Sequence, residues 1–553
     1  MPSTRRKTVL ISEPNAMADM AYLPYLWGTL KTYYERHGKA VDAYQWLEPI
    51  YLRRDPLLLL EPYRGARIDV LGLSCYTWNW DVQRRIARYV REDNPHCLIV
   101  AGGPDPDYKD PEFFRKYPYI DVIVVNDGEI PFTRILDALA EDDRGRFAAI
   151  PGLYLPEGEE RRPVHTGRHE VPTVFDVSPY LAQAGYFERL MKAAGPGVIS
   201  AVWETNRGCP YSCSFCDWGS NTMSKIRRFD MERVKAEADW MGRMGTQVVL
   251  LVDANFGIFP RDLELADALC EARLKHGFPE SLYYSAAKNN PERSIVIAQK
   301  FARAGFIESH FMAVQHTRKE VLEATDRQNI SAEKQKEVAK ALQSQNVPIT
   351  VQLILGIPGD TYDLWKGCLA DLMEWGIHED LEIFPYSLLP NAPAANKEFL
   401  QRWEVETAEC SVTMQHQMPR SFNEDKVLTN KLIVKSKTFS QDDWVHMNVY
   451  AAFVRALHAR CLTRSLALYL RHTHDLSYQA FYEDLIDNFI IAAPAQRCLV
   501  DGIARHCRDA AAGKCGFDQM VTEQLPHYEF FLAMSQWAFV QICLEFDEFW
   551  AAL

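Results

Sequence analysis

The sequence predicts an α/β protein in three parts: an N-terminal doubly wound (Rossmann-like) domain, a partial (β/α)6 barrel and a mostly helical C-terminal domain. Short apolar runs alternate with amphipathic stretches in two successive segments, which is typical of parallel strands joined by helices. The alternation stops after about residue 397. We expect the first domain at 1–150, a linker at 151–195, the barrel at 196–396 and the helical domain at 397–553.

Four apolar runs predict buried parallel strands in the first domain: 7–11, 68–74, 97–101 and 121–125. Stretches such as 81–92 and 132–141 predict the intervening helices. Ligands of doubly wound sheets bind at the carboxyl ends of the strands. Small and polar residues follow three of these strands, where a large planar ligand needs close approach: Ser74, Cys75, Tyr76, Trp78 and Asn79; Gly102, Gly103 and Pro104; Asn126, Asp127, Gly128 and Glu129.

The linker is predicted from its content of Pro, Gly, Arg and Glu. Six strand candidates follow it: 198–205, 247–253, 282–287, 309–315, 349–356 and 381–387. Six units fall short of a closed eightfold barrel, so we predict a partial barrel with its function at the carboxyl ends of the strands. Beyond the barrel, stretches such as 442–471 and 528–553 predict helices.

Three cysteines, Cys209, Cys213 and Cys216, follow the first predicted barrel strand on one short loop. Three thiolates so placed can hold three irons of a four-iron, four-sulfur (4Fe–4S) cube, leaving the fourth iron open to a substrate. Structural zinc would need a fourth Cys or His from a second pair of ligands, and none follows within reach. The ten other cysteines are most simply small buried side chains.

This loop, with Phe215 as the aromatic before the last cysteine, resembles the signature of the radical S-adenosylmethionine (SAM) enzymes. The resemblance implies that the amino and carboxylate groups of SAM chelate the open iron. Electron transfer then breaks a carbon–sulfur bond and releases a 5′-deoxyadenosyl radical. A low-potential cluster with a vacant site can both hold and reduce a sulfonium.

The turns of the first domain, ahead of a cluster loop, resemble the cobalamin-dependent subgroup of this family over roughly residues 5–395. The resemblance implies that those turns bind cobalamin. Many cobalamin proteins carry Asp-x-His-x-x-Gly, whose histidine binds cobalt from below, and the first 150 residues lack it. His37 before Gly38 is more simply a helix end with a glycine cap. Trp78 is the candidate to cover the lower face of cobalt; filling the interface between sheet and barrel is the alternative.

The resemblance also implies where SAM contacts the barrel. Asp253 and Asn255 end the second predicted strand and are available to accept from the SAM amino group; capping the next helix is the alternative. Ser285 and Lys288 end the third strand and Gln315 ends the fourth, where the ribose and carboxylate should lie. The turn that contains Gly356 and Pro358 resembles one whose bare backbone admits the adenine.

Composition limits the partners. A net charge of −13 and a pI near 5.7 argue against a large nucleic-acid footprint. No apolar run approaches the roughly 18 residues of a membrane span, and the first residues do not form a signal-peptide core. Scattered, unpaired cysteines fit a reducing cytoplasm.

The resemblance therefore implies a cobalamin-dependent radical SAM methyltransferase that acts on an unactivated carbon of a natural product or peptide, with a flavodoxin- or ferredoxin-type reductant. One SAM would methylate reduced cobalamin and a second would be cleaved at the cluster. The substrate radical would then collect the methyl group. A non-methylating rearrangement or cyclisation with the same cofactors is the alternative, and a cluster protein without substrate turnover is a third hypothesis.

Overall fold

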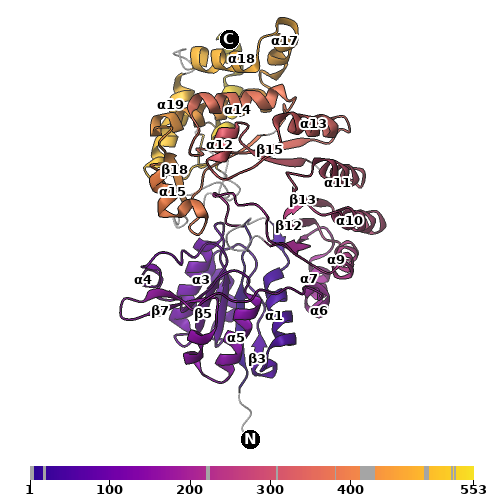
Figure 1. Cartoon of the computed structure of the whole chain (residues 1–553), viewed down its shortest axis with the longest axis vertical. Coiled ribbons are helices and arrows are strands. Elements are labelled where there is room, and N and C mark those ends of the chain that lie inside the picture. Colours follow the sequence, from indigo (N-terminus) through magenta and orange to yellow (C-terminus); the bar gives the residue numbers. More distant parts are fainter. Residues whose placement is uncertain are drawn as a thin grey trace.

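In the computed structural model, three parts follow one another along the long axis of the molecule (Figure 1). The N-terminal α/β domain lies at one end, the barrel in the middle and the C-terminal helices at the other end. The structure describes residues 5–16, 20–218, 225–306, 309–379, 381–410, 430–490, 497–522, 524, 527 and 531–552. The predicted fold class is confirmed, although part of the predicted helix at 528–553 lies outside the described residues.

The N-terminal domain is a seven-stranded sheet in the order β3-β1-β4-β5-β6-β7-β8. Its first five strands are parallel: β1 (Lys7–Ser12), β3 (Tyr44–Trp46), β4 (Val70–Ser74), β5 (Leu98–Gly102) and β6 (Val122–Val124). Successive β1 side chains enter opposite cores, because side chains alternate across a strand: Val9 packs with α1 (Tyr25–His37) and α5 (Glu129–Ala140), and Leu10 with α3 (Trp80–Asp93). Two short helices complete the domain: α2 (Pro56–Leu60) and α4 (Phe113–Lys116).

The predicted linker begins as part of this sheet. Strands β7 (Leu153–Glu157) and β8 (Arg162–His165) form an antiparallel hairpin that extends the sheet beyond β6. The Pro, Gly and Glu that suggested a linker belong to the hairpin strands and their turn, where Gly158 has a φ of 68°. Two helices then lead to the barrel: α6 (Pro179–Ala182) and α7 (Ala184–Ala194).

Each of the six predicted barrel runs overlaps one parallel strand: β9 (Ile199–Trp203), β12 (Val248–Phe256), β13 (Ser281–Ala286), β14 (His310–Gln315), β15 (Ile349–Leu355) and β16 (Leu381–Pro385). Helices cover the outside of these strands (Figure 1): α9 (Met231–Met244), α10 (Asp262–His276), α11 (Pro291–Arg303), α12 (Lys319–Glu323), α13 (Ala332–Gln343) and α14 (Tyr362–Glu374).

The barrel wall consists of two sheets, β13-β12-β9-β2 and β14-β15-β16. Strand β2 (Ala21–Tyr22) comes from the N-terminal part of the chain and pairs in parallel with β9. Side chains join β13 to β14: the Tyr284 hydroxyl hydrogen-bonds His310 Nδ1 at 3.0 Å, and the rings of Tyr283 and Phe311 lie 6.2 Å apart. The wall is therefore held at this seam by side chains.

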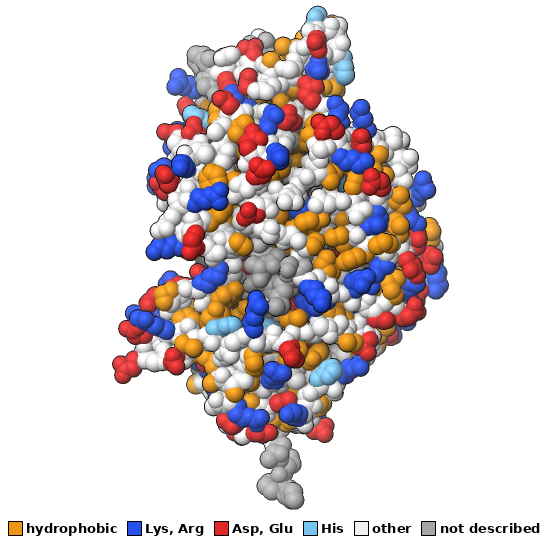
Figure 2. Space-filling model, viewed as in Figure 1, with side chains coloured by type: hydrophobic (Ala, Val, Ile, Leu, Met, Phe, Trp, Pro, Cys, Tyr) orange, Lys and Arg blue, Asp and Glu red, His pale blue; other side chains and the backbone are white. Residues whose placement is uncertain are grey.

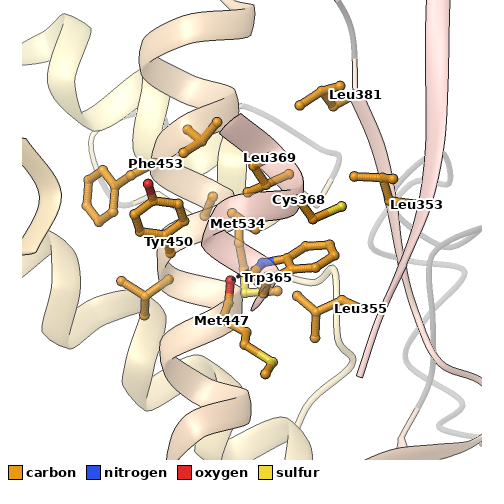
Figure 3. Close-up of a cluster of buried hydrophobic side chains, with 14 of the residues drawn as sticks. Leu353, Leu355, Trp365, Cys368, Leu369, Leu381, Met447, Tyr450, Phe453 and Met534 are labelled. Atoms are coloured by element: carbon orange, nitrogen blue, oxygen red, sulfur yellow. Dashed lines mark hydrogen bonds between the residues drawn. The ribbon is translucent and has the colours of Figure 1, made fainter. Parts of the chain in front are cut away.

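The C-terminal domain continues the hydrophobic core of the barrel. Trp365 of α14 donates its Nε1 hydrogen to the Met447 carbonyl in α16 (Gln441–Val454) at 3.2 Å. Figure 3 shows side chains of α14 and α16, such as Leu369 and Tyr450, that belong to one cluster with Leu353 of β15. The remaining elements are α15 (Lys397–Arg402), β17 (Glu406–Cys410), β18 (Asn430–Lys435), α17 (Arg464–His474), α18 (Tyr478–Glu483), α19 (Arg497–Ala511), α20 (Met534–Leu544) and α21 (Phe546–Ala552).

The stretch predicted as helical at 442–471 contains two helices with an irregular junction. A π-helical turn (Arg455–Ala459) follows α16, and Cys461 adopts a left-handed φ of 67° before α17. The amphipathic pattern alone did not locate this break, because it contains no Gly or Pro.

Candidate active site

The three cysteines lie on a loop whose two ends are clamped together. Strand β10 (Asn206–Arg207) enters the loop and pairs in antiparallel fashion with β11 (Arg227–Arg228), which leaves it. Gly208, directly before Cys209, has a φ of 107°, and a Cβ there would lie 2.9 Å from the Lys225 carbonyl oxygen. Glycine is required at this position, since a side chain would force the two arms apart.

The thiols of the loop meet polar groups from several barrel strands. Asn255 Nδ2 lies 3.3 Å from Cys209 Sγ, and Lys288 Nζ lies 3.6 Å from Cys213 Sγ. The Trp218 amide donates to Cys216 Sγ at 3.4 Å. Burial raises the pKa of the Cys216 thiol to about 11, so a bound metal is needed to hold it as the thiolate.

The chemistry of three thiols on one loop suits an iron–sulfur cluster. Among the described residues, no three His, Cys, Asp or Glu side chains are grouped so that they could hold one metal ion. Zinc would require its ligands to converge on a point, whereas each thiolate of a 4Fe–4S cube binds a different iron. The three cysteines on their clamped loop therefore fit the cube predicted from the sequence.

Sequence reasoning missed a second cation beside the loop, Arg327. Its guanidinium contacts the Ala313 carbonyl, donates to Asn329 Oδ1 at 2.9 Å and lies 5.9 Å from the centre of the Phe215 ring. Burial lowers the pKa of Arg327, and it also lowers the pKa of Lys288, where Arg327 adds to the effect. No motif marks Arg327, because it reaches the site from a loop 111 residues after Cys216.

Asp253 holds the start of the cluster loop. It accepts from the Thr205 amide at 2.7 Å, from the Asn206 amide at 3.1 Å and from Asn206 Nδ2 at 2.6 Å, and also from the Thr205 hydroxyl. Burial raises its pKa to about 7, although these hydrogen bonds oppose the rise. Both carboxylate oxygens thus already accept hydrogen bonds from the chain, and the contact of Asp253 with SAM stays a prediction.

The alternative role, capping of the next helix, is filled by neither Asp253 nor Asn255: the N-cap of α10 is Arg261, which makes no side-chain cap hydrogen bond. Asp262 Oδ2 accepts from the amides of Gly257 and Phe259 at 2.9 and 3.0 Å, at the start of α10. Asp253 and Asn255 face the cluster loop instead, because they stand on the extended end of β12.

The other predicted SAM residues lie at the carboxyl ends of their strands. Ser285 is exposed, Gln315 is half-buried with a left-handed φ of 66°, and Gly356 has a φ of 87° in the turn that contains buried Pro358. Next to Gln315, the buried His316 places its Nε2 3.4 Å from Oδ2 of Asp360. This contact joins the end of β14 to that turn. The structure thus brings these residues to one end of the barrel.

At the carboxyl edge of the N-terminal sheet, the first two predicted turns fold against each other. Gly103 has a φ of 100°, and a Cβ there would lie 2.3 Å from the Cys75 carbonyl oxygen. The rings of Tyr76 and Trp78 stack at 4.4 Å, and Trp78 remains 36% exposed. Trp78 therefore lies partly exposed at this edge, with its ring against that of Tyr76.

Asn79 is a buried residue at the same edge, and its side chain hydrogen-bonds the backbone there. Its Nδ2 donates to the carbonyls of Pro14 and Ser74, both at 2.9 Å, and its Oδ1 accepts from the Tyr76 amide at 2.8 Å. These bonds shape the Tyr76–Trp78 turn, and the side chain is buried. Asn79 therefore satisfies buried backbone groups of this turn with its amide.

The third predicted turn faces the cluster loop. Asp127 and Glu129 both accept from Arg207 Nη1, at 3.2 and 2.7 Å. Burial alone would raise the pKa of Asp127, but the positive charges of Arg207 and Arg227 lower it. The second predicted turn also contacts the barrel: Asn391, which follows β16, donates its Nδ2 hydrogen to the Pro104 carbonyl at 2.9 Å. The edge of the N-terminal sheet and the carboxyl end of the barrel are therefore in direct contact.

Neither early histidine lies at this edge. His37 ends α1, and its ring centre lies 4.4 Å from that of Tyr33. His96 lies 3.7 Å from Asp69, which precedes β4 at the other edge of the sheet. Gly38 follows His37 as predicted, but with a φ of −71°. Glycine is needed there because a Cβ would lie 2.4 Å from the Tyr34 ring.

Comparison with family models divides the chain in the same way. The model of the radical SAM superfamily matches residues 203–372, and that of the B12 binding domain matches residues 58–136. In the part of the chain that the structure describes, no helix is long and apolar enough to cross a membrane.

Two characterised relatives align with most of the chain. It is 36% identical to the cobalamin-dependent radical SAM methyltransferase TokK of Streptomyces tokunonensis over 475 residues. It is 35% identical to the 2-(S-pantetheinyl)-carbapenam-3-carboxylate methyltransferase of Streptantibioticus cattleyicolor over 471 residues. Each alignment covers 85% of this chain and 68% of the relative.

Two solved structures share the fold. The cobalamin-dependent SAM radical enzyme OxsB, with aqua-cobalamin and SAM bound, aligns with a TM-score of 0.62 at 14% identity, over 98% of this chain and 80% of its own. The radical SAM methyltransferase TsrM of Kitasatospora setae, with cobalamin and a [4Fe–4S] cluster bound, aligns with a TM-score of 0.57 at 17% identity, over 73% and 80%.

Proposed function

Because the chain belongs to the cobalamin-dependent radical SAM methyltransferases, we propose that it methylates an unactivated carbon of a small natural product. The predicted enzyme class and cofactors are confirmed: a 4Fe–4S cluster, SAM and cobalamin. Together these cofactors supply radical generation and a transferable methyl group. The chain itself must hold, orient and shield them.

One observation carries the proposal: the two predicted cofactor edges face each other. Asp127 and Glu129 on the sheet side contact Arg207 at the base of the cluster loop, and Pro104 contacts Asn391 of the barrel. A methyl group can be delivered to a substrate radical only if both cofactors border one space, since effective concentration depends on near-contact geometry.

On the barrel side, between the two cofactors, each predicted residue has its own role. Cys209, Cys213 and Cys216 hold the cluster, with Phe215 beside them. Asp253 fastens the loop, and Asn255 orients Cys209. Lys288 and Arg327 place positive charge next to Cys213, where they stabilise thiolates and can receive the SAM carboxylate. Ser285 and Gln315 border the ribose, and the turn at Gly356 and Pro358 borders the adenine.

On the cobalamin side, the bare turns carry the corrin ring. Gly102, Gly103, Pro104 and Gly128 allow close approach, and exposed Asn126, with a φ of 61°, offers its side chain at the edge. Tyr76 and Trp78 form an apolar surface for the lower face of cobalt. Ser74, Cys75 and Asn79 keep that surface in place from beneath, and Asp127 and Glu129 keep the neighbouring turn in place.

For the substrate, we propose a small carboxylate of the kind named for one relative, a pantetheinylated carbapenam. Charged side chains of both signs are interspersed over the face shown in Figure 2, which fits a small ligand better than a nucleic acid. We further propose that the enzyme works in the cytoplasm with a flavodoxin- or ferredoxin-type reductant.

The test is a methyl-transfer assay on the fully reconstituted protein. The protein is incubated with SAM labelled in its methyl group, a reductant, and either a pantetheinylated carbapenam or a peptide pool. We expect label in the carbapenam, together with 5′-deoxyadenosine. Stoichiometric 5′-deoxyadenosine with an altered but unlabelled carbapenam would favour the rearrangement alternative and contradict methylation.

A further inference from the structure

Arg207 makes ion pairs to both domains at once. Its Nη1 reaches Glu129 at 2.7 Å and Asp127 at 3.2 Å in the N-terminal domain. Its Nε and Nη2 reach the two oxygens of Glu204, at the end of β9 in the barrel, at 2.6 and 2.9 Å. The planar guanidinium thus uses both of its edges, which a lysine cannot do.

The surroundings make this arrangement stiff. The side chains of Arg207, Asp127 and Glu129 are 16%, 4% and 6% exposed. Arg207 also lies over the rings of Phe175 and Phe229, at 5.2 and 5.7 Å from their centres. Charges withdrawn from water in this way hold a defined geometry, because breaking one pair leaves the others uncompensated.

A second arginine closes the network from the other arm of the cluster loop. Arg227 Nη2 donates to Asp127 at 3.2 Å, its Nη1 also contacts Asp127, and the same Nη1 donates to the Pro172 carbonyl at 2.9 Å. Both arms of the clamp, β10 and β11, are therefore attached to the turn after β6. The loop cannot shift relative to that turn without breaking several buried ion pairs.

The residues of this network are also neighbours in the sequence of the residues predicted to bind the two cofactors. Arg207 is two residues before Cys209, across Gly208, and Asp127 and Glu129 belong to a predicted cobalamin turn. We propose that Arg207 is a positioning residue that fixes the distance between cobalamin and the iron–sulfur cluster. The proposal rests on the cofactors of the family and is independent of the substrate proposed above.

The experiment compares two network variants with a matched control. Arg207→Lys keeps the charge but loses the two-edged geometry, and Glu129→Gln removes one partner on the N-terminal domain. The control is Arg91→Lys, which alters another arginine–carboxylate pair, with Asp121 at 2.6 Å, that lies within the N-terminal domain. All proteins are reconstituted with cobalamin, iron and sulfide, and their contents of each are measured.

The readout is electron paramagnetic resonance of the reduced cluster beside cob(II)alamin, whose magnetic coupling falls with the inverse cube of their distance. We expect Arg207→Lys and Glu129→Gln to keep both cofactors but to weaken and broaden the coupling, while Arg91→Lys matches the unmodified protein.

Three results would overturn the inference. Unchanged coupling in both network variants would mean that Arg207 does not set the distance. An equal change in Arg91→Lys would mean that any weakened ion pair has this effect. Loss of the cluster from both network variants would mean that Arg207 serves only the folding of the loop.

Discussion

We propose that the side chain of Trp78 covers the lower face of cobalt in place of a protein ligand. It stacks on Tyr76 at the carboxyl edge of the sheet, while both early histidines lie elsewhere. An apolar ring below cobalt discourages water and other lower ligands, which eases reduction of the metal. Axial ligation and local polarity are the means by which a protein sets the potential of a bound metal.

We expect Trp78→His to place a nitrogen below cobalt and shift the absorption spectrum of the bound corrinoid toward a ligated form. His37→Ala and His96→Ala should leave it unchanged. Electron paramagnetic resonance of the cobalt(II) state checks the assignment. Nitrogen hyperfine splitting from a histidine in the unmodified protein would contradict it.

Glu13 gives the N-terminal edge a pH dependence. Its oxygens accept from the amides of Leu26 and Trp27 at 3.0 and 2.7 Å, yet burial outweighs these bonds and raises its pKa from 4.5 to about 8. Between these values the folded protein binds more protons than the unfolded chain. Stability therefore falls as pH rises, by up to about 1.4 kcal/mol per pH unit, and the loss is complete above pH 8.

We expect Glu13→Gln to remove this slope. Urea unfolding of the protein without cofactors, at intervals from pH 5.5 to 8.5, measures it, with the exposed Glu159→Gln as a control. The difference between unmodified and Glu13→Gln protein should grow in favour of the variant as the pH rises. Parallel curves for the two would show that Glu13 titrates normally.

At the scale of elements, the turn after β5 depends on one glycine. Gly103→Ala would force a side chain onto a left-handed backbone and would place its Cβ 2.3 Å from the Cys75 carbonyl oxygen. Gly158 also has a left-handed φ, of 68°, but a Cβ added there would meet no atom within 4 Å. Gly158→Ala therefore measures the cost of the left-handed backbone without a steric clash. We expect that control to lose about 1–2 kcal/mol.

Gly103→Ala should lose about 1–3 kcal/mol more, since overpacking adds to the backbone cost. It should also bind cobalamin more weakly, because the clash pushes apart the turns after β4 and β5. Urea unfolding and corrinoid content provide the two measurements. Equal losses in the two variants, with equal corrinoid content, would show that the close approach is unimportant.

The elements differ in how far sequence reveals them. Apolar runs such as 349–356 predicted the barrel strands because buried parallel strands are continuously hydrophobic. The hairpin β7–β8 was not predicted, since its strands are mostly half-buried or exposed and carry a weaker apolar pattern. For Asp253, the sequence indicated the strand end but not the hydrogen-bond donors: Thr205 and Asn206 are almost 50 residues away, and only folding brings them close.

At the scale of the molecule, the two cofactors have separate carriers. All three proposed cluster ligands come from one barrel loop, and the predicted cobalamin turns come from the N-terminal sheet. We expect a variant with Cys209, Cys213 and Cys216 all changed to Ala to lose reconstituted iron and sulfide but keep most of its cobalamin. Iron, sulfide and corrinoid analysis checks this. A variant that still holds a 4Fe–4S cluster would contradict the cluster assignment.

Strand β2 limits how this protein can be recombined. Ala21 and Tyr22 precede most of the N-terminal domain in the chain, yet they pair with Ile199 and Ser200 of the barrel. A barrel cut out at residue 196 would leave the edge of β9 bare, and bare edges invite aggregation. A chimera that exchanges the barrel with that of a relative must therefore carry residues 20–24 along with it, as a graft from outside the exchanged segment.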